Sequence, residues 1–208
     1  MSMAQDVSQH VKTLERPQWM FWGDRKAAVQ AISGLGTAAG EKAISVLGEV
    51  VSKPGVKWDV RNEAAQALVK LGPAAQPALP GLLRFLLNMD KEGDSIFQGP
   101  VPMSALEAVG AMGPVARSAV PTLVQIVVKY AGRSAKGALD MATGRARPAS
   151  GNIGDIIGFA MGQTMQSVIM HNATKAVGDI LGQPREKTDE ASLELVKWWN
   201  AEGKNQAY

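Results

Sequence analysis

The residue types that perform acid–base, nucleophilic or metal chemistry are few in this chain and widely spaced. The sequence has two histidines, His10 and His171, with no acidic residue directly beside either one, and it has no cysteine. A serine–histidine–acid triad would have to use one of these two histidines, and no serine lies in a nucleophile-elbow motif. Without cysteine there are no disulfides, thiolate metal sites or iron–sulfur clusters. We therefore expect a protein that is not an enzyme and that holds no cofactor and no metal.

Two further segments resemble ligand-binding loops only superficially. Gly34 to Gly40 has the glycine spacing of a dinucleotide-binding loop, but it follows a helical pattern instead of a strand. The linker from Asn88 to Pro102 contains an acidic run, residues 89–94, which lacks the alternating oxygen ligands and the terminal glutamate of an EF-hand loop. We interpret the first as a turn and the second as a solvated loop.

Positive charge gathers in the segment 131–152, where glycine, serine and alanine fill the remaining positions. The positive residues of this segment and its edge are Lys129, Arg133, Lys136, Arg145 and Arg147, against one negative residue, Asp140. The composition predicts a flexible basic insertion, and such a segment binds phosphates by counterion release. The candidates for anion binding are Arg133, Lys136, Arg145 and Arg147. A solvated excursion without a ligand is the alternative, and the net charge of the chain is only +3.

An internal repeat in the sequence predicts the helices that position these residues. When residues 60–87 are shifted by 41 positions, Gly72-Pro73 falls on Gly113-Pro114, and small residues fall on small and large on large throughout. Shifting the same residues back by 36 positions gives another copy, in which Arg61 falls on Arg25, Leu83 on Leu47 and Leu86 on Val50. That copy lacks the prolines. A fourth, degraded copy is predicted to start near His171. In it Ala173, Ala176, Val177 and Ile180 repeat the pattern of the first helix, and Gly182 is displaced by one residue.

Each copy predicts two helices. In the first helix Ala64, Leu68 and Leu71 have helical spacing, Asp59 is the expected N-cap, and Gly72 ends the helix. The second helix carries a stripe at positions i, i+3, i+4 and i+7, made of Leu79, Leu82, Leu83 and Leu86. In the next copy Ser104 with Glu107 forms a capping box, which predicts a helix start at Ser104. One pair cannot bury its apolar stripes alone, so the pairs are expected to stack.

The repeated residues resemble a known family. The matching run is Asp59-Val60-Arg61, Ala64-Ala65, Ala67-Leu68, Leu71-Gly72-Pro73-Ala74-Ala75, Ala78-Leu79-Pro80 and Leu82-Leu83, followed in the next copy by Gly113-Pro114-Val115-Ala116 and Ala119-Val120-Pro121. This pattern resembles HEAT repeats of the short bacterial type that also occurs in phycobilisome-lyase proteins. The resemblance covers residues 25–130 well and 165–200 poorly. It implies an all-α fold, a right-handed α-solenoid of about four helix pairs with one insertion.

Three groups of residues outside the repeat are candidates for protein binding. The aromatic residues near the N-terminus are Trp19, Phe21 and Trp22, and those near the C-terminus are Trp198 and Trp199. Solenoids need capping elements at both ends, and tryptophan is also enriched at the centres of interfaces, so each group is either a cap or a binding site. The third group is Gly154, Gly158 and Gly162. Glycines four residues apart on a helix allow close approach of another helix, whereas Asp155 interrupts the apolar run and argues against a membrane span.

These observations give one domain with several parts. The expected divisions are an N-terminal cap at 1–24, repeats at 25–53, 59–88 and 103–130, the flexible basic insertion at 131–152, and a degenerate repeat with a C-terminal cap at 153–208. We expect a non-catalytic scaffold or adaptor that binds another protein, as a subunit of a larger assembly; the alternative is binding of nucleic acid or phosphate through the basic insertion and the solenoid surface. The N-terminus lacks the continuous apolar core of a signal peptide, which favours the cytoplasm. The sequence does not specify an oligomeric state.

Overall fold

The computed structural model describes residues 3–16, 22–89, 100–142, 153–206 and 208, and these form helices and turns without any strand. The fold is therefore all-α, as predicted. The helices are α1 (Met3–Glu15), α2 (Trp22–Leu35), α3 (Gly40–Ser52), α4 (Trp58–Leu71), α5 (Leu79–Asn88), α6 (Val101–Ala111), α7 (Val120–Ala142), α8 (Ile153–Leu181) and α9 (Asp189–Ala201). Short 3₁₀ turns follow α2, α4, α6 and α9, at Gly36–Ala39, Gly72–Ala78, Gly113–Ala119 and Gly203–Asn205.

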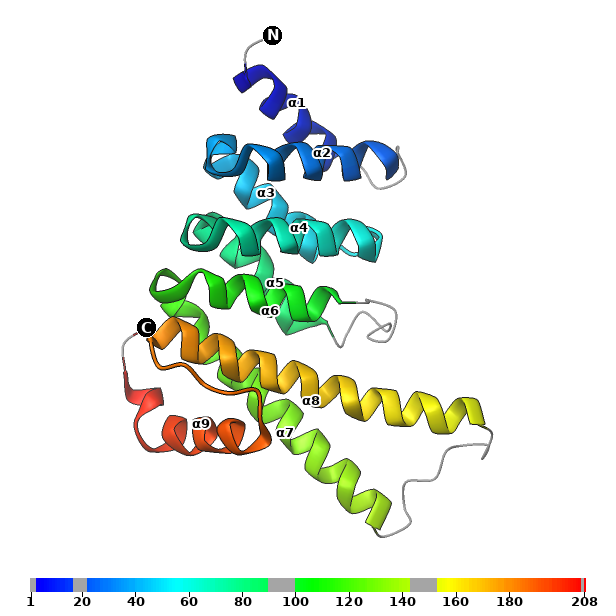
Figure 1. Cartoon of the computed structure of the whole chain (residues 1–208), viewed down its shortest axis with the longest axis vertical. Helices are drawn as coiled ribbons and strands as arrows, with labels where there is room; N and C mark the ends of the chain where they lie inside the picture. The colour runs from blue at the N-terminus through cyan, green and yellow to red at the C-terminus, as the bar shows by residue number, and fades with distance from the viewer. Residues whose placement is uncertain (1–2, 17–21, 90–99, 143–152, 207) are drawn as a thin grey trace.

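The helices lie in two rows along the long axis of the molecule (Figure 1). The first row contains α2, α4, α6 and α8, and each of these helices packs on the next one. The second row contains α1, α3, α5, α7 and α9, which pack on one another in the same order. The core lies between the rows and includes the fully buried side chains of Leu47, Leu68, Leu82, Leu123 and Ile180. The described chain therefore alternates between two rows, and the apolar face of each helix meets a neighbour.

A glycine in the left-handed region ends each first-row helix. The φ angles are 56° at Gly36, 54° at Gly72, 62° at Gly113 and 68° at Gly182. A side chain at such a position is strained, and glycine adopts this conformation at little cost. The predicted helix stop at Gly72 is thus confirmed. Gly182 has the same role after α8, although the sequence alignment placed it one residue out of step.

The second helix of the first pair has a different register from the one that the sequence comparison gave. Ile44, Leu47, Val50 and Val51 of α3 are buried, and so are Leu79, Leu82, Phe85 and Leu86 of α5, which makes these residues equivalent. The alignment at 36 positions had paired Leu83 with Leu47 and was wrong here by one residue. The connection in the first pair contains one extra residue, which is accommodated by a second left-handed glycine, Gly40, with a φ of 79°.

Two predicted helix starts are also corrected. α4 begins at Trp58, so Asp59 lies inside the first turn instead of at the N-cap. α6 begins at Val101, with Pro102 in its first turn, where the missing amide hydrogen of proline costs nothing. Ser104 therefore does not cap the helix. Its hydroxyl donates a hydrogen bond of 2.8 Å to the Asn62 side-chain oxygen on α4, which joins two first-row helices.

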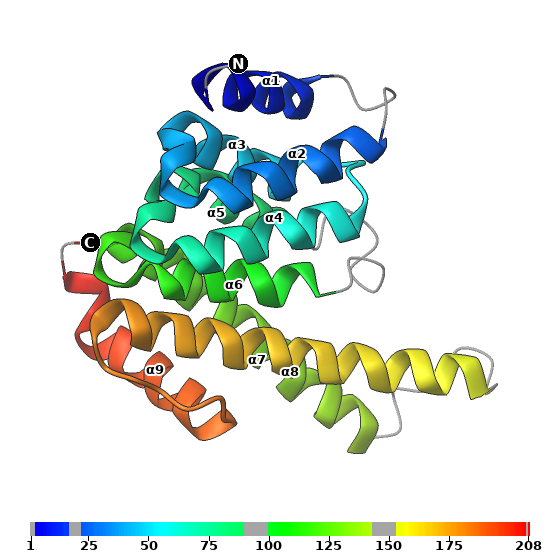
Figure 2. The same ribbon diagram turned by 45° about the horizontal axis from the view of Figure 1, so that its top comes forward.

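The predicted flexible insertion at 131–152 is wrong for its first half. Residues 131–142 continue α7, which has 23 residues, and α8 has 29, whereas the other helices have between 10 and 14. Alanine and leucine, which favour helix, are frequent enough in this stretch to outweigh its glycines. Residues 132–142 of α7 and 153–163 of α8 project beyond the stack as two helical segments that diverge toward their ends, and we call these segments the arm (Figures 1 and 2). Residues 143–152 lie outside the described residues.

The degraded fourth copy lies in the second half of α8. Its predicted apolar residues Ala173, Ala176, Val177 and Ile180 are all buried. The helix that carries them starts much earlier than His171, at Ile153. In this last pair, α8 is the first-row helix and α9 is the second-row helix.

Two buried arginines occupy equivalent positions in successive pairs. The Arg61 Nε atom donates a hydrogen bond of 2.7 Å to the Val51 carbonyl oxygen at the end of α3. The Arg25 Nη2 atom donates one of 2.6 Å to the Arg16 carbonyl oxygen, just after α1. A cation at a helix C-terminus stabilises the carbonyl groups that have no partner within the helix. Helix α1 therefore has the same position relative to α2 as α3 has relative to α4. It is the second-row helix that precedes α3.

Helices α3 and α5 approach each other backbone to backbone. A Cβ atom added to Gly81 would lie 2.4 Å from the Gly48 carbonyl carbon, and one added to Gly48 would lie 2.5 Å from the Ala78 carbonyl oxygen. Neither obstacle is a flexible side chain that could move aside. The spacing between α3 and α5 thus depends on two residues without side chains.

The variant Gly81→Ala is expected to lower the free energy of unfolding by about 1–3 kcal/mol, because the added methyl group would force α3 and α5 apart. Helix propensity alone would favour the alanine by about 1 kcal/mol. Gly34→Ala on α2 is the matched control, since nothing lies within 4 Å of its added Cβ atom. Urea denaturation should show destabilisation of the first variant and no loss in the second. Equal stability of both variants would contradict the close contact.

Candidate protein-binding surfaces

The N-terminal end of the first row is closed by a polar residue. Asp24 on α2 is exposed, whereas the residues at the same position of α4, α6 and α8 are the buried Val60, Val101 and Ile169. These three apolar side chains are buried within the stack, whereas α2 has no preceding first-row helix among the described residues. A carboxylate at this position keeps the end of the row compatible with water.

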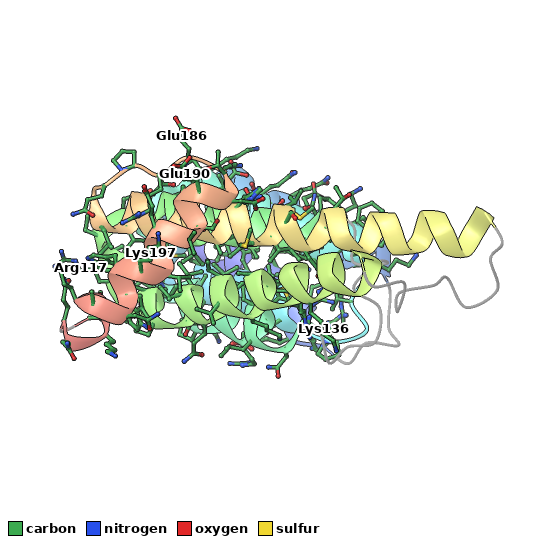
Figure 3. The ribbon with its side chains drawn as sticks, turned by 90° about the horizontal axis from the view of Figure 1, so that it is seen from below. Arg117, Lys136, Glu186, Glu190 and Lys197 are labelled. Atoms are coloured by element: carbon green, nitrogen blue, oxygen red, sulfur yellow. The ribbon has the colours of Figure 1, made fainter. Side chains whose placement is uncertain are left out.

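The C-terminal end is closed by the chain itself. After α8 the segment 182–188 folds back along that helix, and the Gln183 amide donates a hydrogen bond of 2.9 Å to the Gly178 carbonyl oxygen. A Cβ atom at Gly178 would lie 2.6 Å from the Gln183 carbonyl oxygen, so the segment sits directly on the helix backbone. The outward side of α9 carries charged residues such as Glu190 and Lys197 (Figure 3). Both ends of the stack are therefore largely polar or covered, apart from Leu193 on α9, which is 55% exposed.

The C-terminal aromatic candidates Trp198 and Trp199 are half-buried and contact each other and the end of the chain. Their ring centroids lie 6.2 Å apart, and the Trp199 ring lies 5.7 Å from that of Tyr208. The Tyr208 hydroxyl donates a hydrogen bond of 2.7 Å to the Gly203 carbonyl oxygen. A Cβ atom at Gly203 would lie 2.8 Å from both indole rings. Burial raises the pKa of Tyr208 above its ordinary value, while the Arg117 charge opposes the shift. These contacts favour a cap.

The other aromatic and glycine candidates are placed only in part. Trp19 and Phe21 lie outside the described residues, and Trp22 is the first residue of α2, with no description of its side chain. Gly154, Gly158 and Gly162 lie in the arm, on the N-terminal half of α8. Their spacing of four places them on one side of a continuous helix.

The structure likewise describes only some of the anion-binding candidates. Arg133 and Lys136 lie on α7 and are exposed, as is Lys129, and the spacing i, i+4, i+7 places all three on one face of the helix. We call these three residues the basic stripe. The guanidinium carbon of Arg133 and the Lys129 ammonium lie 5.4 and 5.8 Å from the centroid of the Tyr130 ring. Arg145 and Arg147 lie outside the described residues.

Sequence analysis did not single out an exposed apolar pair on the second row. Leu87 on α5 is 47% exposed and Val128 on α7 is 46% exposed. The two residues are 41 positions apart, so they occupy the same place in successive repeats. The repeat alignment contained this signal, but apolar residues next to a buried stripe look like core residues in a sequence.

A groove on the same row is lined in part by Arg84, which lies three residues before Leu87 on α5. It has a volume of about 380 Å³ and is lined by apolar residues of α1 and α3, by the connection after α3, and by one ion pair. The lining residues include Leu14, Val46, Val50, Pro54, Glu49 and Arg84. The Arg84 guanidinium donates two hydrogen bonds, of 2.7 and 3.2 Å, to the Glu49 carboxylate across α5 and α3. We call the groove, Leu87 and Val128 together the second-row face; Arg133 and Lys136 of the basic stripe lie in the arm.

A histidine and an aspartate form a close contact that their spacing in the sequence did not reveal. His171 Nε2 lies 2.8 Å from Asp189 Oδ1, although the two residues are 18 positions apart. No group of three or more histidine, aspartate or glutamate side chains within the described ranges has a geometry that could hold a metal ion. The pair instead joins α8 to the start of α9.

A second hollow, of about 400 Å³, lies beside this pair, between the returning segment and α9. Its lining is polar and includes Gln183, Arg185, Glu186, Thr188, Glu190 and Glu194. The Arg185 guanidinium carbon lies 6.0 Å from the centroid of the Trp198 ring. The hollow therefore belongs to the C-terminal cap and has little apolar surface to offer a partner.

Comparison with known proteins gives no match: no family model fits the chain, and neither a curated protein nor a solved structure is significantly similar to it.

None of the helices in the described ranges is by itself both long and apolar enough to cross a bilayer. One pair passes that test only jointly, Val101–Ala111 with Gly113–Arg133, and its two members meet at an angle of 117°.

The variant Trp199→Ala is expected to lower the free energy of unfolding by about 2 kcal/mol, because it removes ring contacts that hold the C-terminal end. Trp58→Ala is the control, since that ring is 50% exposed at the start of α4; its cost should stay below about 1 kcal/mol. Thermal and urea denaturation measure both values. If Trp199→Ala leaves stability unchanged but abolishes partner binding, Trp199 belongs to a binding site and not to a cap.

Proposed function

We propose that this protein is a non-catalytic scaffold of the HEAT-type α-solenoid class, which binds another protein through its second-row face. The left-handed glycines at equivalent turns and the equivalent buried arginines support a repeated architecture of four helix pairs. The resemblance of residues 25–130 to short bacterial HEAT repeats points in the same direction. A right-handed solenoid built in this way acts by offering a long surface to a partner.

The observation that carries the proposal is the contrast between the ends and the side of the stack. Both ends are largely polar or covered, and the apolar residue that is exposed on α9 at the C-terminal end, Leu193, has no equivalent exposed residue in a neighbouring repeat beside it. The side carries Leu87 and Val128, two large aliphatic residues that are almost half exposed at successive repeats, and the groove lies on the same row. Exposed apolar residues that gather on one surface mark interaction sites more often than scattered ones do.

The proposal predicts that partner binding depends on the side of the stack and not on its end. The full chain with Leu87→Glu and Val128→Glu should lose the protein that the wild type retains in affinity capture. Leu193→Glu is the matched control, because this leucine is 55% exposed on α9 at the C-terminal end. It should retain the partner. A wild type that retains no specific protein, or equal losses in both variants, would overturn the proposal.

Binding of nucleic acid or phosphate is the second candidate, and the basic stripe is the observation that favours it. Contacts to phosphates release counterions, so binding should appear at low salt and weaken steeply as salt rises. Fluorescence anisotropy with a labelled duplex in about 50 mM salt tests this. The triple variant Lys129→Gln, Arg133→Gln, Lys136→Gln should lose the signal, and the triple variant Lys187→Gln, Lys197→Gln, Lys204→Gln should keep it. No binding by the wild type at micromolar protein would exclude this candidate.

A further inference from the structure

The last second-row helix buries fewer residues than another helix of the same length in that row. α9 and α3 have 13 residues each. Eight residues of α3 are buried, whereas α9 has two, Ser192 and Leu195. The rings of Trp198 and Trp199 on α9 are half-buried. Apolar burial is the main favourable contribution to packing, so few side chains hold α9 on α7 and α8.

The side of α8 that contacts α9 carries a hydroxyl at a position where the other first-row helices carry only hydrocarbon. Thr174 is fully buried at this position. The equivalent residues of α2, α4 and α6 are Val29, Ala65 and Leu106, which are also fully buried. The Thr174 Oγ1 atom lies 2.9 Å from the Oγ atom of Ser192 on α9. The contact between α8 and α9 therefore has a polar centre that the preceding first-row helices do not provide.

This hydroxyl pair contributes little to the attachment of α9, because its hydrogen atoms have competing acceptors. The Thr174 hydroxyl lies 3.0 Å from the Met170 carbonyl oxygen of its own helix. The Ser192 hydroxyl lies 2.9 Å from the Thr188 carbonyl oxygen, just before its own helix. A hydroxyl has one hydrogen atom to donate, so two hydrogen atoms serve three contacts. When α9 separates from α8, each hydroxyl keeps the acceptor on its own side of the contact.

Two further contacts of α9 and the connection before it are weak. The Asp189 side chain, which contacts His171 on α8, is 83% exposed. An exposed pair of this kind contributes little to stability. The Arg185 guanidinium carbon lies 6.0 Å from the centroid of the Trp198 ring, at the outer limit of a cation–π interaction. The contact between α9 and the stack is therefore small and partly polar, as is typical of parts of a chain that move relative to each other.

We propose that α9 is a releasable cover, which detaches from α7 and α8 as one unit while the remaining helices stay folded. The left-handed Gly182 ends α8, and the connection 183–188 then leads to α9. α8 can therefore keep its helical structure when α9 leaves. Detachment uncovers the side of α8 that carries Thr174, at the C-terminal end of the stack (Figure 1). The inference concerns this end of the stack and does not rest on binding at the second-row face.

The chain has no cysteine, so one introduced thiol reports the exposure of one site. Ser192→Cys places a thiol at the contact with α8, where the serine is 2% exposed. Ala105→Cys is the control, because Ala105 is fully buried on α6 in the middle of the stack. Both full-length variants are treated with excess iodoacetamide without denaturant, and mass spectrometry follows the modification. The thiol of Ser192→Cys is expected to react at least about a hundredfold faster than that of Ala105→Cys, because local opening requires less free energy than global unfolding.

A destabilising substitution in the middle of the stack provides a second test. Val109 is fully buried on α6, so Val109→Ala leaves a cavity and raises the population of globally unfolded chains. The slowest-exchanging amides of α4 are then expected to exchange at least about tenfold faster, whereas the amides of α9 keep their wild-type exchange rates. The difference arises because a separate opening of α9 leaves the surroundings of residue 109 intact. Hydrogen exchange with mass spectrometry measures both helices.

Equal modification rates of the two thiols would overturn the inference, and so would equal acceleration of exchange in α4 and α9 by Val109→Ala. Either result would show that α9 leaves only when the whole stack unfolds. If the thiol of Ser192→Cys reacts as fast as one in an unfolded peptide, α9 has no closed position and the inference is also wrong. Circular dichroism and the unfolding midpoint verify that each variant is folded. Ser104→Cys, at a buried position of the same helix, replaces the control if Ala105→Cys fails to fold.

Discussion

Burial on more than one side of each first-row helix is the constraint on which the whole structure depends. The helices α4 and α6 must pack on the preceding helix, on the next helix and on the second row at the same time. Alanine satisfies this demand because it lets helices approach closely while it still removes apolar surface from water. Ala64, Ala67, Ala105 and Ala108 are all fully or almost fully buried. Longer side chains, mostly of the second row, fill the space that remains. One pair of helices separated from the stack would expose these surfaces, so each pair stabilises its neighbours.

The sequence predicted the helical class and the turns within each pair because these depend on local signals. A glycine followed by proline ends one helix and starts the next segment, and Gly72 and Gly113 are in that conformation. The start of α6 was misplaced because Ser104 matches a capping box by type, while its hydroxyl bonds to Asn62 on another helix. The register of α3 was missed because one extra residue at Gly40 has no signature in a comparison that allows no gaps. The extent of α7 was missed because glycine and serine suggested a loop where alanine and packing against α8 favour helix.

The candidate binding residues were harder to predict than the fold. Tryptophan is ambiguous by type, since a ring on an end helix can close the stack or bind a partner; only the contacts among Trp198, Trp199 and Tyr208 favour the first role. Leu87 and Val128 look like core residues in the sequence, and their exposure follows from the rotation of α5 and α7 about their axes, which periodicity defines only approximately. The approach of Asp189 to His171 depends on the return of the chain after Gly182. These features need three-dimensional information.

The continuity of α7 and α8 through the arm has a mechanical consequence. Both helices run without a break from the core of the last two pairs into the projecting segment. A continuous helix resists bending, so the arm has no hinge where it leaves the stack. Any tilt imposed on its distal end acts as a lever on α6 and α9, which pack against the proximal parts of the same two helices. A force applied to the distal end is therefore transmitted to the layers that contain Val128.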